Sequence, residues 1–332
     1  MIEPVYRASD SRYQVDGMPY RRCGCSGVLL PAISLGLWQN FGSTVPFERS
    51  KAIMHYAFDH GVTHFDLANN YGPEYGTAEE TFGRMMQRSF APYRDELFIS
   101  TKAAYDMWPG PYGIGGSRKH LMASLDQSLR RMKLDYVDIF YIHRYDPTTP
   151  LTETLRTLVD MVRSGKTLYV GISRWPKDAL TFGLEYLKAH ECPCLLLQDR
   201  LNLLDRQVME SGCLELAHNE GSGFVAFSPL AQGLLTDRYL HGVPADSRAA
   251  RGAHLTTAAL TPQLLQKLSE LDRMARQRGQ TLAQMALSWI LSHEAVTSVL
   301  VGASSVEQLE ANLKAAENTV FSDDERRLLD AL

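Results

Sequence analysis

The stretch His64-Phe65-Asp66-Leu67-Ala68-Asn69-Asn70-Tyr71-Gly72 joins the end of a strand to a carboxylate and a tyrosine. Apolar Phe65 and Leu67 alternate with Asp66 and Ala68, which indicates a short strand, and the following asparagines and glycine break it into a turn. A carboxylate at the end of a buried strand needs a partner, because an unpaired charge is costly to bury. A tyrosine hydroxyl titrates near ~10, so it donates a proton at neutral pH only where a neighbour such as lysine stabilises the phenolate.

Two further predicted strands carry the groups that would complete this arrangement. Lys102 lies near the end of the next strand, and His143 ends the strand after that. In a barrel of parallel strands, the carboxyl ends of all strands meet at one face. The sequence therefore predicts that Asp66, Tyr71, Lys102 and His143 converge on one site.

Eight strand–helix units follow one another along the chain. The predicted strands are short and apolar on both faces, which is typical of buried parallel strands. They cover 33–38, the stretch ending near Ala68, 97–103, 137–143, 167–173, 194–198, 223–229 and 298–302. A β-hairpin around Ser26-Gly27 precedes them, and long loops follow the third strand at 104–116 and the seventh at 230–260. This pattern predicts an α/β fold, a (β/α)8 TIM barrel with an N-terminal β-hairpin and long loops at the C-terminal face.

A doubly wound parallel sheet is the alternative fold for such a chain. That fold would need a Gly-x-Gly-x-x-Gly motif after the first strand, where this chain has Gly36-Leu37-Trp38-Gln39-Asn40-Phe41. No linker, composition shift or low-complexity segment divides the sequence. We therefore expect residues 1–332 to form a single barrel domain.

Composition limits the class of protein and its partners. Of 332 residues, 45% are hydrophobic and 22% charged, as in ordinary globular proteins, and the net charge of -4 argues against a nucleic-acid partner. Because the chain has neither a long apolar run nor the features of a signal peptide, we expect no membrane association and a cytoplasmic location. The spacing of Cys23 and Cys25, and of Cys192 and Cys194, does not suit zinc, so we predict reduced thiols and no metal.

These motifs resemble the aldo-keto reductase superfamily over nearly the whole chain, from about Tyr20 to Leu313. The resemblance rests on Phe65 to Ala68 with Tyr71-Gly72, Ser100 to Lys102, Asp138 to Arg144, Gly171 to Ser173, Phe227 to Thr236 and Gly302 to Ser304. Within the superfamily, Asp106 to Gly113 is similar to the bacterial L-glyceraldehyde 3-phosphate reductases, which are relatives of the potassium-channel β-subunits. The resemblance implies an NADPH-dependent reductase of small aldehydes, such as glyceraldehyde 3-phosphate or methylglyoxal, with aldehyde detoxification as its role.

The resemblance assigns the catalytic residues of the family to Asp66, Tyr71, Lys102 and His143. In a carbonyl reduction, Tyr71 would protonate the oxygen as it gains negative charge, and Lys102 would stabilise the phenolate left behind. Asp66 would keep Lys102 charged and in place, while His143 would hydrogen-bond the carbonyl and orient it. Each of these residues alone is usually structural, so their joint occurrence at four matched positions is what favours a reductase.

The resemblance also implies that NADP(H) lies across the mouth of the barrel. The residues implied to bind it are Trp38, Asp66, Ser173, Arg174, Gln198, Ser228, Pro229, Leu230, Gly233, Arg238, Arg248, Gly302, Ser304, Gln308 and Asn312. Ser304 and Glu307 also fit a capping box, so the last barrel helix is predicted to begin at Ser304 and to offer its N-terminus to a phosphate.

Three positions depart from the pattern of the relatives. Leu201 stands where an aromatic residue stacks on the nicotinamide, and Ser305 stands where an arginine grips the 2′-phosphate. Ala311 replaces an acidic residue that contacts the adenosine. We therefore expect NADPH to be preferred over NADH by a modest margin.

Trp38, at the end of the first strand, and Trp108, on the long loop after Lys102, are expected to wall the substrate pocket together with His143. An alternative function is a regulatory protein that binds NADP(H), as a channel β-subunit does; those proteins carry asparagine in place of His143. A barrel metal hydrolase is less favoured, because no His-x-His motif or paired carboxylates stand at the strand ends. The resemblance to proteins that form tetramers or larger rings implies a homo-oligomer.

Overall fold

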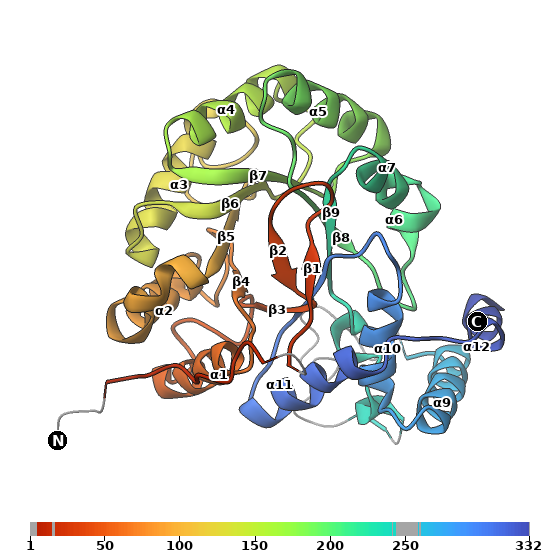
Figure 1. Ribbon diagram of the computed structural model, residues 1–332. Coiled ribbons are helices and arrows are strands. Elements are labelled where there is room, and N and C mark those ends of the chain that lie inside the picture. The colour runs from red at the N-terminus through yellow and green to blue at the C-terminus, as the bar shows by residue number, and fades with distance from the viewer. Residues whose placement is uncertain (1–4, 15–16, 241, 244–257, 259, 332) are drawn as a thin grey trace.

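Eight parallel strands close into a barrel in the computed structural model, which describes residues 5–14, 17–240, 242–243, 258 and 260–331 (Figure 1). The strands follow one another in chain order, and the first and last of them pair to close the ring. They are β3 (Ile33–Gly36), β4 (His64–Asp66), β5 (Phe98–Ala103), β6 (Val137–Ile142), β7 (Thr167–Ser173), β8 (Leu196–Arg200), β9 (Gly223–Phe227) and β10 (Ser298–Val301). The predicted (β/α)8 TIM barrel is confirmed.

Helices surround the barrel and connect its strands (Figure 1). They are α1 (Phe47–Asp59), α2 (Thr77–Met85), α3 (Arg118–Met132), α4 (Leu151–Arg163), α5 (Lys177–Ala189), α6 (Gln207–Glu210), α7 (Cys213–Asn219), α9 (Pro262–Gln277), α10 (Leu282–Leu291), α11 (Val306–Leu313) and α12 (Asp323–Ala331). One π-helical turn, Met86–Phe90, extends α2. In the described part of the chain, no helix is both long enough and apolar enough to cross a membrane.

Local sequence explains why these helices form where they do. In α4, Leu155, Leu158 and Val159 recur at helical spacing and are all buried against the barrel. At the start of α10, Thr281 accepts a hydrogen bond from the backbone of Gln284, whose side chain caps Thr281 in return. This capping box satisfies two backbone donors that a helix end would otherwise leave unpaired.

The interior of the barrel is filled by side chains from its strands. Every residue of β6 is buried, as expected for a parallel strand covered on both faces. A Cβ at Gly171 in β7 would lie 2.4 Å from the Tyr141 ring, so this position in the neighbouring strand requires glycine.

The predicted hairpin, β1 (Tyr20–Arg22) and β2 (Leu29–Pro31), closes the amino end of the barrel. Arg21 donates to the carbonyl of Val296 at 2.8 Å, and the backbone of Cys25 donates to that of Gly221 at 3.0 Å. Because Gly221 and Val296 precede β9 and β10, these contacts hold the hairpin against the starts of the strands (Figure 1). Only the carboxyl ends of the strands are left to build a site.

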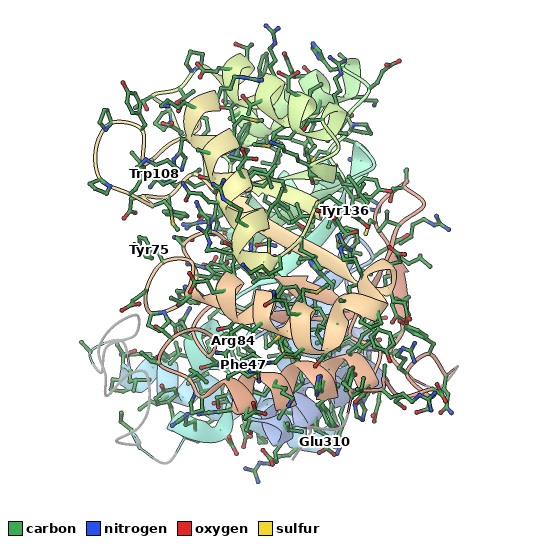
Figure 2. The ribbon with its side chains drawn as sticks, turned by 90° about the vertical axis from the view of Figure 1, so that its left-hand side faces the viewer. Phe47, Tyr75, Arg84, Trp108, Tyr136 and Glu310 are labelled. Atoms are coloured by element: carbon green, nitrogen blue, oxygen red, sulfur yellow. The ribbon has the colours of Figure 1, made fainter. Side chains whose placement is uncertain are left out.

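The long loop 104–116, which follows β5, lies at that carboxyl end. Trp108 in the loop 104–116 and Tyr75 after β4 lie at one side of the molecule, whereas Tyr136, which precedes β6, lies toward the other (Figure 2). The predicted loop 230–260 is described only in part, and its first residues form the short 3-10 turns Ala231–Gly233 and Asp237–Tyr239.

Candidate active site

The ends of β4 and β5 bring a buried ion pair under a tyrosine. Lys102 Nζ donates to Asp66 Oδ2 at 2.6 Å, to the carbonyl of Leu67 at 2.6 Å and to the Tyr71 hydroxyl oxygen at 3.3 Å. An ammonium group only donates, so Tyr71 accepts this bond and keeps its own hydrogen for another acceptor. Asp66 and Lys102 are fully buried, while Tyr71 is partly exposed above them.

Burial controls the protonation of this pair of groups. The removal of water from around the hydroxyl, with the negative charge of Asp66 nearby, raises the pKa of Tyr71 well above 10.0. Burial lowers the pKa of Lys102, and the Asp66 carboxylate opposes that change. At neutral pH, the Tyr71 hydroxyl is therefore protonated and can donate its proton to a neighbouring acceptor.

His143 follows β6 and faces Tyr71. The centroids of the two rings are 5.7 Å apart in an edge-to-face arrangement. The backbone N–H of His143 donates to the carbonyl of Ala103 at 2.9 Å. Burial, together with the charges of Lys102, Arg174 and Arg144, lowers the pKa of His143 well below 6.5. The imidazole is therefore neutral at neutral pH, and its buried Nδ1 has no hydrogen-bond partner among the described residues.

A chain of hydrogen bonds leads from Asp66 into the barrel interior. Ser100 Oγ donates to Asp66 Oδ1 at 2.7 Å, His64 Nε2 lies 3.2 Å from Ser100 Oγ, and His64 Nδ1 lies 2.9 Å from Ser34 Oγ. Because a carboxylate only accepts, Ser100 gives its hydrogen to Asp66, so His64 donates from Nε2 and accepts at Nδ1. Burial lowers the pKa of His64 to about 4, which keeps the ring neutral. The bonds all point their hydrogens toward Asp66 and stabilise its charge.

Two predicted cofactor residues at the carboxyl end of the barrel are buried with polar side-chain atoms that lack a described hydrogen-bond partner. Ser173 ends β7 and Asn312 lies in α11; both are buried, and in the part of the chain that the structure describes Ser173 Oγ and Asn312 Nδ2 have no hydrogen-bond partner. Such orphaned groups fit a ligand that supplies the missing hydrogen bonds. The side-chain amide of Gln198 already has a protein partner, because it donates to Asp66 Oδ1 at 3.0 Å. Arg174 donates to the Tyr105 hydroxyl at 2.8 Å.

The loop after β9 holds four more predicted cofactor residues. Ser228, Pro229, Leu230 and Gly233 lie in a segment where Ser228, Ala231, Gln232 and Gly233 all have positive φ, from 46° to 96°. Non-glycine residues rarely adopt such angles, and they cluster where a loop must present its backbone to a ligand. Arg238 follows on the next 3-10 turn, and Arg248 lies outside the described residues.

The prediction that the last barrel helix begins at Ser304 is wrong by one residue. Ser305 is the N-cap of α11, because its side chain accepts from the backbone of Gln308 at 3.3 Å. Gln308 in turn accepts from the backbone and hydroxyl of Ser304, and Gly302 lies exposed just before them. The capping box predicted between Ser304 and Glu307 is therefore not formed.

The other two departures from the pattern of relatives lie in different surroundings. Leu201 is fully buried in the main hydrophobic core. Ala311 is exposed on α11, and its carbonyl accepts from Gln284 at 2.9 Å.

The two predicted substrate tryptophans differ in their surroundings. The Trp38 ring lies 6.4 Å from that of Tyr71 and is 37% exposed, so it lies at the mouth of the site. The Trp108 ring packs against His120 of α3, 4.9 Å away, on the outer loop (Figure 2).

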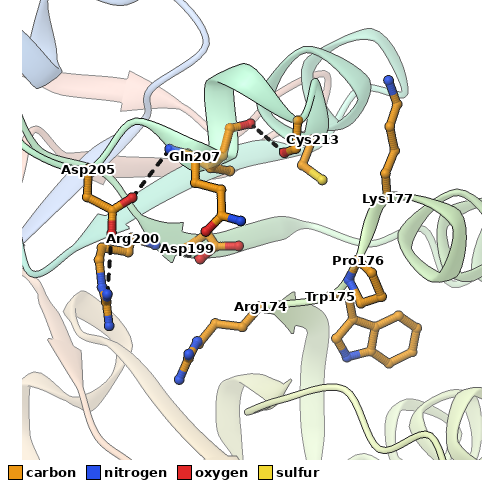
Figure 3. A pocket seen from close by; sticks show the side chains of 11 residues that line it. Arg174, Trp175, Pro176, Lys177, Asp199, Arg200, Asp205, Gln207 and Cys213 are labelled. Atoms are coloured by element: carbon orange, nitrogen blue, oxygen red, sulfur yellow. Dashed lines mark hydrogen bonds and ion pairs between the residues drawn. The ribbon is translucent and has the colours of Figure 1, made fainter.

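A pocket of about 260 Å³ lies beside Arg174, at the ends of β7 and β8 (Figure 3). Its lining is Arg174, Trp175, Pro176, Lys177, Asp199, Arg200, Asp205, Gln207, Val208, Ser211 and Cys213. It contains one predicted cofactor residue, Arg174, and none of the four predicted catalytic residues. Arg200 is paired with Asp205 at 3.3 Å, so these two charges of the lining offset each other.

Two residues that contact the site were not predicted from the sequence, Tyr105 and His64. Tyr105 follows β5, and its ring packs edge-to-face on His143 at 4.7 Å. Its position just past a strand end, like that of Tyr71, was a usable signal. His64 gave no such signal, because its partners Ser34 and Ser100 belong to other strands.

Comparisons with known proteins agree with this geometry. The model of the aldo/keto reductase family matches residues 32–332. The chain is 56% identical over 330 residues to an L-glyceraldehyde 3-phosphate reductase of Escherichia coli O157:H7, and 55% identical to that of strain K12; each match covers 98% of this chain and 95% of the relative. A probable voltage-gated potassium channel subunit beta of Arabidopsis thaliana is 36% identical over 305 residues, covering 90% of this chain and 92% of the relative. The chain therefore belongs to the aldo/keto reductase family of oxidoreductases.

Proposed function

We propose that this protein is an NADPH-dependent reductase of small aldehydes, such as glyceraldehyde 3-phosphate or methylglyoxal, and that it removes reactive aldehydes from the cell. One observation carries the proposal: Lys102 Nζ lies 2.6 Å from Asp66 Oδ2 and 3.3 Å from the Tyr71 oxygen. A buried ammonium that touches both a carboxylate and a phenol is suited to stabilise a phenolate after proton donation.

In the proposed reaction, Tyr71 donates its proton to the carbonyl oxygen as negative charge develops there. Lys102 then stabilises the phenolate, and Asp66 keeps Lys102 charged. Neutral His143 donates one hydrogen bond to the same oxygen, which orients the carbonyl and spreads the developing charge.

NADPH, when bound, supplies the hydride to the carbonyl carbon. The unpartnered polar atoms of Ser173 and Asn312, and the positive-φ loop from Ser228 to Gly233, support a dinucleotide site across the barrel mouth. Arg238, Ser304 and Gln308 would hold its phosphates, and Trp38 would lie near the nicotinamide.

An assay of NADPH oxidation with a panel of short aldehydes tests the proposed function. We expect turnover of glyceraldehyde 3-phosphate and methylglyoxal that depends on both protein and aldehyde. A purified, folded protein that binds NADPH but does not oxidise it in the presence of any aldehyde of the panel would instead favour the alternative, a regulatory protein like a channel β-subunit. His143 favours the reductase, because an imidazole at this position can act on a carbonyl.

We expect NADPH to bind more tightly than NADH. The preference is expected because no carboxylate is assigned to bind the free ribose 2′-hydroxyl of NADH. The margin should be modest, because Ser305, the N-cap of α11, stands where relatives have an arginine that binds the 2′-phosphate. Dissociation constants for both cofactors, measured at one ionic strength, check this. Equal values would remove the 2′-phosphate site from the proposal.

The aromatic wall of the substrate pocket can be tested with two matched variants. Trp38→Ala should raise KM for small aldehydes more than Trp108→Ala, because Trp38 lies beside Tyr71 whereas Trp108 packs on His120. The kcat should change less than KM in both, since a lost apolar contact acts on substrate and transition state alike. A larger KM effect for Trp108→Ala would mean that the loop 104–116 closes over the substrate.

We further propose that residues 1–332 form one domain, since strands from β3 to β10 close a single barrel. We also propose a cytoplasmic homo-oligomer, a tetramer or larger, with a small aldehyde and no nucleic acid or membrane as its partner. The low net charge of -4 supports the absence of a nucleic-acid partner.

A further inference from the structure

Two arginines flank Tyr105, the ring that packs against His143. The guanidinium carbon of Arg144 lies 4.6 Å from the centroid of the Tyr105 ring, and Arg174 donates to the Tyr105 hydroxyl at 2.8 Å. Arg144 directly follows His143, and Arg174 directly follows Ser173 at the end of β7. The cluster of Tyr105, Arg144 and Arg174 is therefore the immediate neighbour of the proposed carbonyl site.

Among the described residues, no carboxylate is paired with Arg144 in this cluster, whereas Arg174 lies close enough to the Asp199 carboxylate for the two charges to interact. Among the residues that the structure describes, neither arginine forms an ion pair, and the buried Nε of Arg144 has no hydrogen-bond partner at all. Both charges act on His143 and help to lower its pKa. Two guanidinium groups around one tyrosine repel each other unless an anion lies between or beside them.

We propose that Arg144 and Arg174 form an anion subsite that holds the phosphate of a phosphorylated aldehyde while its carbonyl lies against Tyr71 and His143. This inference rests on the proposed reductase function and names its substrate class. A row of aromatic rings connects the proton donor with the arginines. The ring centroids of Tyr71 and His143 are 5.7 Å apart, and those of His143 and Tyr105 are 4.7 Å apart. A guanidinium suits a phosphate because its planar fork makes charge-assisted, paired hydrogen bonds.

The neighbouring pocket of Figure 3 is a weaker place for the phosphate. Its lining includes Lys177, but Arg200 there is already paired with Asp205, and Asp199 adds a second carboxylate. An anion entering this pocket would meet both carboxylates, whereas the described contacts of Arg144 include none. Arg174 lines the pocket and is also a proposed cofactor residue, so Arg144 is the better residue to test.

The test compares kcat/KM for glyceraldehyde 3-phosphate and for unphosphorylated glyceraldehyde at saturating NADPH. Arg144→Met should lower the value for the phosphorylated aldehyde by about 10–100-fold, the effect of one charge-assisted hydrogen-bonding group, and the value for glyceraldehyde by far less. Arg144→Lys should restore part of the loss, because it keeps the charge but not the fork. Arg200→Met is the matched control and should leave the ratio of the two values unchanged.

Equal losses with both aldehydes would overturn the inference and make Arg144 a structural residue. A fall in the ratio for Arg200→Met instead of Arg144→Met would move the phosphate to the pocket of Figure 3. Calorimetric binding of glycerol 3-phosphate against glycerol, to wild type and Arg144→Met, decides the matter without turnover. Tighter binding of glycerol 3-phosphate that is lost in Arg144→Met supports the subsite even if no aldehyde is reduced. No preference in the wild type overturns the subsite while leaving the reductase function untouched.

Discussion

Tyr71→Phe should lower kcat for aldehyde reduction by about 10²–10⁴-fold while NADPH affinity stays nearly unchanged. The substitution removes one hydroxyl, the proton donor proposed for the carbonyl oxygen, and keeps the ring that packs against His143 and Trp38. The loss should appear in kcat because the proton is needed only as charge develops in the transition state. Steady-state kinetics with one short aldehyde, together with NADPH titration, measure both quantities.

The pH dependence of the wild-type enzyme provides a check on the same assignment. Burial and Asp66 raise the pKa of Tyr71, so the donor stays protonated through the neutral range and its donation fails only at alkaline pH. The kcat for reduction should therefore be flat near neutrality.

A Tyr71→Phe variant that kept more than half of the wild-type kcat would assign the proton to another group.

Asp66→Asn should destabilise the fold by about 3–5 kcal/mol and abolish turnover. The change leaves Lys102, which is 0% exposed, without the carboxylate at 2.6 Å that balances its charge. Since burial already lowers the pKa of Lys102 and Asp66 opposes this, losing Asp66 lowers it further and favours a neutral amine. Urea unfolding monitored by fluorescence measures the free energy of unfolding.

A double variant separates loss of the ion pair from general damage to the barrel. Asp66→Asn with Lys102→Met removes both charges, so it should be more stable than Asp66→Asn alone, although it should remain inactive. If the double variant were less stable than either single variant, the two residues would contribute independently, and the buried pair would not explain the cost.

The sequence by itself determined the barrel and the four residues at its mouth. Short apolar strands repeat between helices, and parallel strands all end at one face, so the positions of Asp66, Lys102 and His143 along the chain place them together. This inference needs only the alternation of elements. The hairpin before the barrel was equally local, because it depends on a turn between two short strands.

Details that depend on contacts between distant segments were decided by the tertiary structure. Ser305 caps α11 in place of Ser304. This choice between adjacent residues depends on backbone angles, which packing of the whole barrel sets and periodicity does not resolve. Spacing placed Trp38 and Trp108 alike, but only Trp38 lies beside Tyr71.

The tertiary structure also joined residues that no motif connects. Ser34, His64 and Ser100 come from three strands and form the hydrogen-bond chain that ends at Asp66. The grouping of Arg144 and Arg174 around Tyr105 arises in the same way, from the ends of different strands. The sequence determines which groups reach the mouth of the barrel because strand order and direction are local properties. Their pairing is decided only when the barrel closes, because closure sets the distances between side chains far apart in the chain.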